Sequence, residues 1–293
     1  MRIFHNRTDP FIYDSVCALG NFDGIHRGHM EIIERLKKLR SKNRKIGIIT
    51  FKPSPVSFLH KNEIFFLTTT AEKERILDAI EIDFIFYFKF DNEFAEKSPE
   101  QFVQLVYETI KPHALIVGEN FHFGKGRKGS ADLLDKLARG KFDVEIISTI
   151  RDQEGIISST RIRELLLLGN IPGANRILGR NYALSGKVIK GKGKGTTLGF
   201  PTINLSVEKE KLLPLDGVYE VKLVIDNTPY KGAMFLSHNN IEVHILDFSG
   251  NLYDQEITVE LIRRIRSIKK FPDDNLLKKA ISEDIDKISH SKI

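Results

Sequence analysis

The sequence contains a single cysteine, Cys17, and no tryptophan. One cysteine excludes an intrachain disulfide and any metal site that needs several thiolates. The apolar neighbours in "SVCAL" indicate a small buried residue rather than a nucleophile. No apolar run reaches membrane-spanning length, and the first residues lack the apolar core of a secretory signal. We therefore expect a cytoplasmic protein without a membrane partner.

Acidic residues are in the minority. The 45 Lys and Arg residues outnumber the 39 Asp and Glu residues, which gives a formal net charge of +6. This balance fits partners that carry phosphate, such as nucleotides or nucleic acids, and it does not choose among them. Lysine-rich runs such as "RLKKLRSKNRK" are more typical of a solvated helix face than of a binding patch. The length of 293 residues favours two domains.

Strands and helices alternate through the first half. Strands are predicted at 15–20, 45–51, 83–90, 113–118 and 143–148, and helices at 28–40, 69–80, 98–111 and 131–138. Thr69 with Glu72, and Ser98 with Gln101, match the capping box that begins a helix. Strands separated by helices of this length predict an α/β fold with a parallel sheet and helices on both faces.

Short strands and turns replace this pattern in the second half. Strands are predicted at 183–191, 217–226, 228–236, 241–248 and 253–262, and a last helix at 272–289. This pattern favours an antiparallel β-barrel with a terminal helix. Two short helices at 158–180 serve as a connector, so we predict one domain at 1–180 and a second at 181–293.

The stretch "LGNFDGIHRGH" places two histidines and three glycines where a buried strand gives way to a helix. Ligands of an open parallel sheet bind at the carboxyl ends of its strands, and a helix N-terminus attracts anions. Gly20 lets the backbone turn, and Gly28 permits close approach at the helix start. His26 and His29 would donate to phosphate oxygens and stabilise developing charge. Ordinary capping histidines are the alternative, and the coincidence of these features favours the phosphate site.

Two other segments suit anions by composition. "GKGRKGS" is a glycine-rich loop with three basic residues that follows a predicted strand. "SSTRIR" offers hydroxyl groups and two arginines at a predicted helix start. Surface salt bridging is the alternative for Arg161 and Arg163.

"GNFDGIHRGH" resembles the H-x-G-H signature of nucleotidyltransferases, in the form carried by the prokaryotic bifunctional riboflavin kinase/FAD synthetase family. "VGENFHFGKGRKGS", "ISSTRIR" and "TFKPSP" are similar to further segments of the synthetase half, although Ser54 replaces a histidine of the last one. The resemblance implies a Rossmann-like nucleotidyltransferase domain that transfers AMP from ATP to FMN, with His26 and His29 as catalytic residues. It also implies nucleotide-binding roles for Gly20, Phe22, Asp23, Gly28, Asn120, Arg127, Ser158, Ser159, Thr160 and Arg161.

"SGKVIKGKGKGTTLGFPTINL" interleaves glycines with lysines and ends on two oxygen-bearing residues, Thr202 and Asn204. Oxygen ligands of this kind suit Mg²⁺ bound with a nucleotide. The segment, with "LPLDGVYEV" and "IEVHILDF", resembles the riboflavin kinase module of the same family. The resemblance implies that Thr202 and Asn204 hold Mg²⁺–ATP and that Glu242 is the catalytic base for riboflavin, whereas alone Glu242 is equally typical of an exposed strand. It implies nucleotide-binding roles for Gly191, Lys192, Gly195 and Pro201.

Two departures from the family affect the second half. Before Glu242 the family usually carries a longer segment where this chain has only "LSHNN", and Asp254 stands where the family tends to have glycine. The shortened segment motivates one alternative, a monofunctional FAD synthetase whose barrel binds flavin without phosphorylating it.

The expected function is bifunctional flavin cofactor synthesis: ATP-dependent phosphorylation of riboflavin to FMN, followed by adenylylation of FMN to FAD. The more distant alternative is a nucleic-acid-binding protein, which only the isoelectric point of about 9.2 and the small barrel support. We expect ATP, riboflavin and FMN as small-molecule substrates, Mg²⁺ as the metal, no nucleic-acid partner, and a monomer or weak homo-oligomer.

Overall fold

The computed structural model describes residues 1–6, 8–59, 65–191 and 194–291. It divides into two compact units, Met1–Ser159 and Thr160–Ile293. None of the helices within those described ranges is long and apolar enough to cross a membrane. Each unit has its own central sheet.

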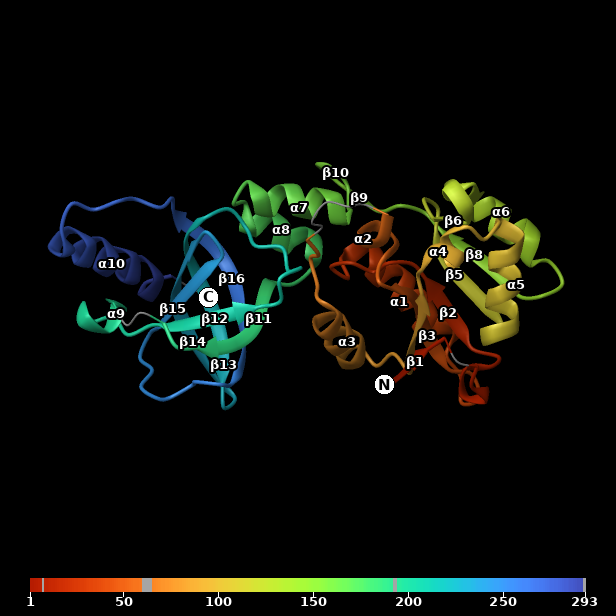
Figure 1. Cartoon of the computed structure of the whole chain (residues 1–293), viewed down its shortest axis with the longest axis horizontal. Coiled ribbons are helices and arrows are strands. Elements are labelled where there is room, and N and C mark those ends of the chain that lie inside the picture. The colour runs from red at the N-terminus through yellow and green to blue at the C-terminus, as the bar shows by residue number, and fades with distance from the viewer. Residues whose placement is uncertain (7, 60–64, 192–193, 292–293) are drawn as a thin grey trace. The chain divides into compact units, whose positions relative to one another are not determined.

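A six-stranded parallel sheet forms the centre of the first unit (Figure 1). Its strand order is β1–β4–β3–β2–β5–β8, and every neighbouring pair is parallel, which confirms the predicted sheet. The sequence did not predict the edge strand β1, which is short and mostly exposed. The strands are β1 (Arg2–His5), β2 (Val16–Leu19), β3 (Ile46–Lys52), β4 (Phe84–Lys89), β5 (Ala114–Gly118) and β8 (Asp143–Ile147).

Helices cover both faces of this sheet (Figure 1). One face packs against α1 (Arg27–Leu39) and α3 (Thr70–Ala79), and the other against α5 (Pro99–Ile110) and α6 (Ala131–Ala138). The four residues of β2 are at most 2 % exposed, so neither face of this strand reaches solvent. Burial raises the pKa of the Cys17 thiol to about 12, as expected for an inert core residue.

Both predicted capping boxes are present. Thr69 Oγ1 accepts a hydrogen bond from the backbone N–H of Glu72, whose carboxylate accepts one from the N–H of Thr69. Ser98 and Gln101 form the same pair of bonds at the start of α5. Each box satisfies two N–H groups that the helix itself leaves without acceptors.

Short elements connect the main strands and helices of the first unit. They are η1 (Pro10–Ile12), α2 (Pro55–Leu59), α4 (Asn92–Ala95), β6 (His122–Phe123), η2 (Lys125–Arg127), β7 (Gly129–Ser130), β9 (Arg151–Asp152) and β10 (Gly155–Ile156). The two predicted connector helices are α7 (Ser159–Leu167) and α8 (Ile171–Leu178). The predicted domain boundary at residue 180 stays a prediction.

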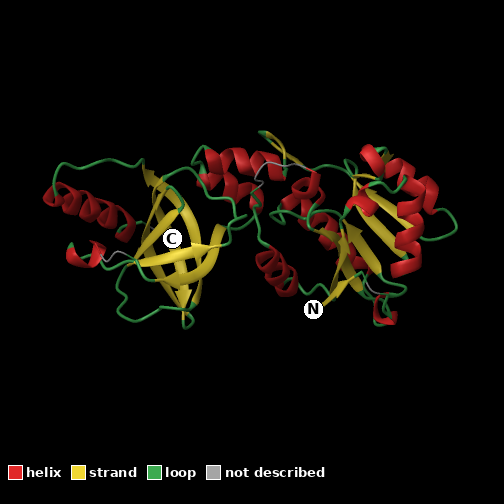
Figure 2. Cartoon of the chain, in the orientation of Figure 1, coloured by secondary structure: helices red, strands yellow, loops and turns green. Residues whose placement is uncertain are grey.

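The second unit is built around a closed antiparallel barrel (Figure 2). The order around the barrel is β11–β12–β15–β14–β13–β16, and α10 (Asp274–Ser289) follows it, which confirms the predicted barrel and terminal helix. A short helix, α9 (Lys194–Thr197), precedes β12. The sequence did not predict β12. The strands are β11 (Tyr182–Ile189), β12 (Ile203–Val207), β13 (Gly217–Ile225), β14 (Thr228–Ser237), β15 (Asn240–Ile245) and β16 (Glu256–Arg266).

The shortened segment before Glu242 is a two-residue hairpin turn. Ser237 pairs with Asn240 at the ends of β14 and β15, and His238 and Asn239 lie between them. Their φ angles are 47° and 65°, and left-handed backbone at both central positions is the geometry that matches the twist of a hairpin. The barrel therefore closes without the longer segment.

Asp254 also has a left-handed backbone, with φ of 66°. Glycine adopts this conformation at little cost, and Asp and Asn are among the other residues that tolerate it best. The backbone thus explains how an aspartate can stand where the family tends to have glycine. Lys187 Nζ lies 2.8 Å from Oδ1 of Asp254, and both side chains are more than half exposed.

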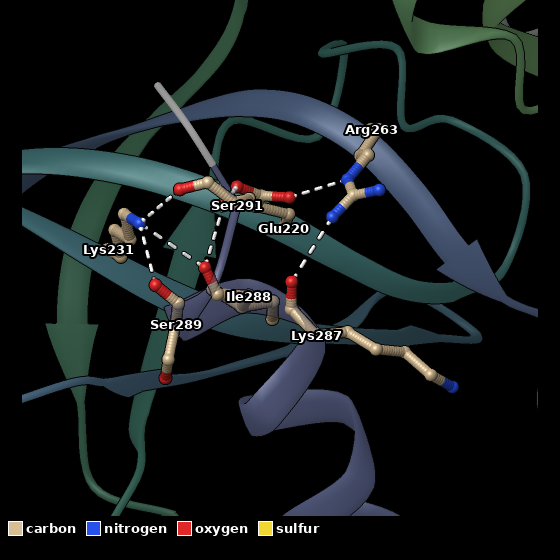
Figure 3. Close-up of polar contacts among 7 residues, drawn as sticks. All are labelled: Glu220, Lys231, Arg263, Lys287, Ile288, Ser289 and Ser291. Carbon is tan, nitrogen blue, oxygen red and sulfur yellow. Dashed lines mark hydrogen bonds and ion pairs between the residues drawn. The ribbon is translucent and has the colours of Figure 1, made fainter.

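A polar cluster fixes the C-terminal end of α10 to the barrel (Figure 3). The Glu220 side chain on β13 is 2 % exposed, and its carboxylate accepts hydrogen bonds from Arg263 Nε at 2.6 Å and from the Ser291 hydroxyl. Lys231 Nζ donates to three backbone carbonyls within 288–291, at 2.8–3.3 Å. A cation is favourable there because helix C-termini carry partial negative charge.

We expect Glu220→Gln to lower the free energy of unfolding by about 2 kcal/mol, because it weakens a charge-assisted hydrogen bond to a buried carboxylate. Calorimetric unfolding of the full chain would measure this. Asp254→Asn removes an exposed ion pair and should change the value by less than about 0.5 kcal/mol. Equally small changes in both variants would contradict this structural role of Glu220.

Candidate active sites

The carboxyl ends of β2 and β5 are neighbours at the point where the chain changes direction across the sheet. From β2 the chain continues to β3 and then β4 on one side, whereas β5 pairs with the other side of β2. Ligands of open α/β sheets bind outside the strand ends at such a switch point. The loop at 20–26 follows β2 there, and the loop at 119–121 follows β5.

His26 and His29 form a stacked pair at the start of α1. Their ring centroids are 3.7 Å apart and their planes differ by 16°. Each Nδ1 accepts a hydrogen bond from the backbone N–H of the other residue at 3.4 Å, which closes a capping box. Because Nδ1 accepts, the neutral form of each ring carries its proton on Nε2. Each imidazole therefore has an Nε2–H donor beside a helix N-terminus.

Gly28 and Phe22 shape the surroundings of these rings. A Cβ atom at Gly28 would lie 3.1 Å from Cε1 and Nδ1 of His26, so a larger residue would displace the ring. Phe22 is 2 % exposed, and its ring centroid lies 5.1 Å from that of His29. A Cβ at Gly20 would lie 3.3 Å from the Phe22 ring. Phe22 thus supports the histidine pair from the hydrophobic core.

Asp23 is buried and ties the same loop to the segment before α3. Its Oδ1 accepts from the N–H of Thr68 at 3.1 Å, and its Oδ2 from the N–H of Leu67 at 3.3 Å. Thr68 Oγ1 in turn accepts from the N–H of Gly24 at 3.1 Å. Ser159 Oγ donates to the backbone carbonyl of Asp23 at 2.8 Å, which brings together two predicted residues that are 136 positions apart.

Lys73 lies beside this loop, and no sequence pattern indicated it. Its Nζ donates to the backbone carbonyl of Asn21 at 2.7 Å. Burial lowers the pKa of the Lys73 ammonium, and the negative charges of Asp23 and Glu74 partly offset that effect. Lysines are common on helices such as α3, so only the tertiary contact identifies this one.

The other predicted residues of the first half occupy two segments. Asn120 follows β5, and its Nδ2 donates to Thr149 Oγ1, after β8, at 2.8 Å. Ser158 belongs to the first compact unit, as Ser159 does. Thr160 and Arg161 begin the second unit and lie in the first turn of α7.

Several residues from the sequence analysis lie outside these contacts. Arg127 is exposed at the end of η2, and Pro201 is exposed just before β12. Ser54 caps α2 by accepting a hydrogen bond from the N–H of Ser57 at 3.2 Å. Lys192 lies outside the described residues.

A cavity of about 700 Å³ adjoins the barrel and is lined by Thr202, Asn204 and Glu242. Asn204 on β12 stands directly opposite Glu242 on β15. Successive side chains of a strand point to opposite faces, and Val243 is fully buried inside the barrel. The polar side chains on either side of it therefore face the cavity.

Asn240 fixes the Glu242 carboxylate. Its Nδ2 donates to Glu242 Oε1 at 2.8 Å, and the two residues share a face because they are two positions apart on β15. Asn240 was not predicted, since an asparagine beside a turn has no distinctive sequence signal.

Gly191 and Gly195 pack against the two oxygen-bearing side chains. A Cβ at Gly191 would lie 1.9 Å from the amide nitrogen of Asn204, and one at Gly195 would lie 3.0 Å from Thr202 Oγ1. A side chain at Gly191 would displace the Asn204 amide, and one at Gly195 would also lie 2.5 Å from the backbone carbonyl oxygen of Phe200. Both positions need glycine for close approach, in addition to any contact with phosphate.

Family models match both halves of the chain. The model described as FAD synthetase matches residues 9–161, and the model described as riboflavin kinase matches residues 178–292. These matches follow the same order as the parallel-sheet unit and the barrel.

Curated relatives extend over most of the chain. The bifunctional riboflavin kinase/FMN adenylyltransferase of Buchnera aphidicola subsp. Schizaphis graminum is 37% identical over 290 residues, which cover 93% of this chain and 92% of that protein. The proteins of the same description from Listeria monocytogenes and Escherichia coli strain K12 are each 32% identical. They cover 88% and 97% of this chain, and 86% and 95% of their own lengths.

A crystal structure described as a macrolide-efflux protein from Streptococcus pneumoniae is 28% identical, with a TM-score of 0.89 over the whole of both chains. It shares the fold of this chain. The two family models, matched in order, and the bifunctional relatives of 32–37% identity agree with one another. The chain belongs to the bifunctional riboflavin kinase/FMN adenylyltransferase family.

Proposed function

We propose that this protein phosphorylates riboflavin to FMN in its barrel unit and adenylylates FMN to FAD in its parallel-sheet unit, with ATP as the donor in both reactions. One observation favours a bifunctional enzyme over a monofunctional FAD synthetase. Thr202, Asn204 and Glu242 line one cavity although about 40 residues separate the first two from the third. The short hairpin leaves these three side chains on one cavity, which supports a kinase site.

In the kinase reaction, Glu242 accepts the proton of the riboflavin 5′-hydroxyl as that oxygen attacks the γ-phosphorus of ATP. The bond between the γ-phosphorus and the bridging oxygen breaks, and ADP leaves. The hydrogen bond from Asn240 holds the carboxylate in one orientation. This restricts Glu242 to one approach toward the hydroxyl, which lowers the entropic part of the barrier.

The donor set at the start of β12 fits Mg²⁺ carried by ATP. Thr202 Oγ1 and Asn204 Oδ1 are hard oxygen ligands, and Mg²⁺ is usually bound by few protein groups together with phosphates and water. In the ranges that the structure describes, no three His, Cys, Asp or Glu side chains form a metal site of their own. When bound, Mg²⁺ would neutralise charge on the transferring phosphates.

In the adenylyl transfer, a phosphate oxygen of FMN attacks the α-phosphorus of a second ATP, and pyrophosphate leaves. The Nε2–H groups of His26 and His29 donate to the charge that develops on the phosphate oxygens. Ser159, the first residue of α7 and the last of the parallel-sheet unit, contacts the leaving pyrophosphate. Asn120 contacts the flavin or the nucleotide.

A product assay tests the proposal. The purified full chain receives Mg²⁺ and ATP with riboflavin in one reaction and FMN in another, and the flavins are separated by chromatography. FAD in both reactions is the expected result. FAD from FMN alone would favour a monofunctional FAD synthetase, and tight, salt-sensitive RNA binding without any flavin product would favour a nucleic-acid-binding protein.

Loss of the second imidazole should separate the two activities. We expect His29→Ala to lower FAD formation from FMN by about 100- to 1,000-fold, because a donor to developing charge is lost, and to leave FMN formation from riboflavin unchanged. His29→Gln is the matched variant, since glutamine can still close the capping box of α1. If His29→Gln retains activity, then His29 contributes only by capping the N-terminus of α1.

Loss of the carboxylate should have the opposite effect. We expect Glu242→Gln to slow FMN formation by about 100- to 10,000-fold, because the amide cannot accept the hydroxyl proton, and to leave FAD formation from FMN unchanged. Glu256→Gln, on an exposed position of β16, is the control. A Glu242→Gln variant that makes FMN at the normal rate would exclude Glu242 as the base.

A further inference from the structure

His244 occupies the same cavity wall as Glu242 but has no role in the reaction described above. It lies two residues beyond Glu242 on β15, so the two side chains share a face. Both line the cavity. The register pairs Ile203 with Val243 and Asn204 with Glu242. Continued by one residue, it would bring Thr202 opposite His244.

The imidazole of His244 is held by two neighbours. Its Nδ1 lies 2.8 Å from the backbone carbonyl oxygen of Pro201, and its ring meets the ring of Phe200 edge-on, with centroids 5.7 Å apart. A carbonyl oxygen only accepts, so Nδ1 must carry the proton of this hydrogen bond. His244 therefore binds the backbone immediately before Thr202.

The backbone before Pro201 is held by its N–H groups. Leu198 and Phe200 donate to the carbonyl of Gly195 at 3.1 and 2.8 Å, and Gly199, with a left-handed φ of 90°, donates to that of Thr196 at 3.1 Å. Proline has no N–H, so Pro201 can be anchored by a backbone hydrogen bond only through its carbonyl. The hydrogen bond from His244 fixes this carbonyl, directly before Thr202 and the start of β12.

We propose that His244 is a positioning residue for ATP in the kinase site. Its Nδ1–H holds the Pro201 carbonyl, and this keeps the Thr202 hydroxyl beside the Asn204 amide on the cavity wall. Thr202 is the residue through which His244 acts. The inference rests on the proposed kinase function of the barrel.

Two substitutions separate the hydrogen bond from the ring. His244→Asn retains an N–H donor near the position of Nδ1, whereas His244→Phe retains a ring against Phe200 without a donor. In the full chain, with total FMN and FAD formed from riboflavin as the readout, we expect His244→Phe to raise KM for Mg²⁺–ATP about five-fold. We expect kcat to change little, and KM of His244→Asn to stay near that of the unmodified protein.

A double-mutant cycle tests the route through Thr202. Thr202→Val alone should raise KM, and adding His244→Phe should raise it no further, because the anchor then has no hydroxyl to position. Independent, multiplicative effects on KM would overturn the inference. Equal KM values for His244→Asn and His244→Phe would also overturn it, as would a fall in kcat with unchanged KM, since that would place His244 on the reacting groups.

The ring itself provides a readout independent of turnover. Two-bond ¹H–¹⁵N correlation spectra of the labelled protein should show His244 protonated at Nδ1, assigned by its loss in His244→Phe. A neutral ring protonated at Nε2 would overturn the contact. If the unmodified protein forms no FMN, the proposed function fails together with the inference. If it forms FMN and His244→Phe has a normal KM, only the inference fails.

Discussion

The burial of sheet faces is the constraint that decides where chemistry can occur in each unit. In the first unit helices cover both faces, and β2 has no exposed side, so polar groups can gather only at the strand ends. In the barrel the inner face is filled by core residues such as Val243, so the outer face of β12 and β15 carries the polar groups. The first unit therefore presents its polar groups from loops at the strand ends, and the barrel presents its polar groups from strands.

Anchoring by polar side-chain contacts is common to both candidate sites. In the first unit, Asp23 and Ser159 tie the histidine loop to segments that are distant in the sequence. In the barrel, Asn240 fixes the carboxylate of Glu242 in the same way. Groups held before the substrate arrives need little reorganisation during the reaction, which is the physical basis of electrostatic catalysis.

Close contacts with neighbouring side chains, rather than backbone flexibility, explain Gly28 and Gly191. Gly28 leaves room for the His26 ring, and Gly191 leaves room for the Asn204 amide. The departures from the family follow backbone geometry as well. His238 and Asn239 form a left-handed two-residue turn in place of a longer segment, and the barrel remains closed.

The sequence by itself determined the two architectures, the helix starts with Thr69 and Ser98 as caps, and the segments that identify the family. These depend on local periodicity and short-range hydrogen bonds, which neighbouring residues specify. Only the tertiary structure decided the short strands β1 and β12 and the contacts of Lys73 and His244. A strand of four or five residues is too short for its pattern to stand out from a loop, so it depends on its partner strands. A contact between residues more than 40 positions apart leaves no local pattern, so neither could be predicted from one sequence.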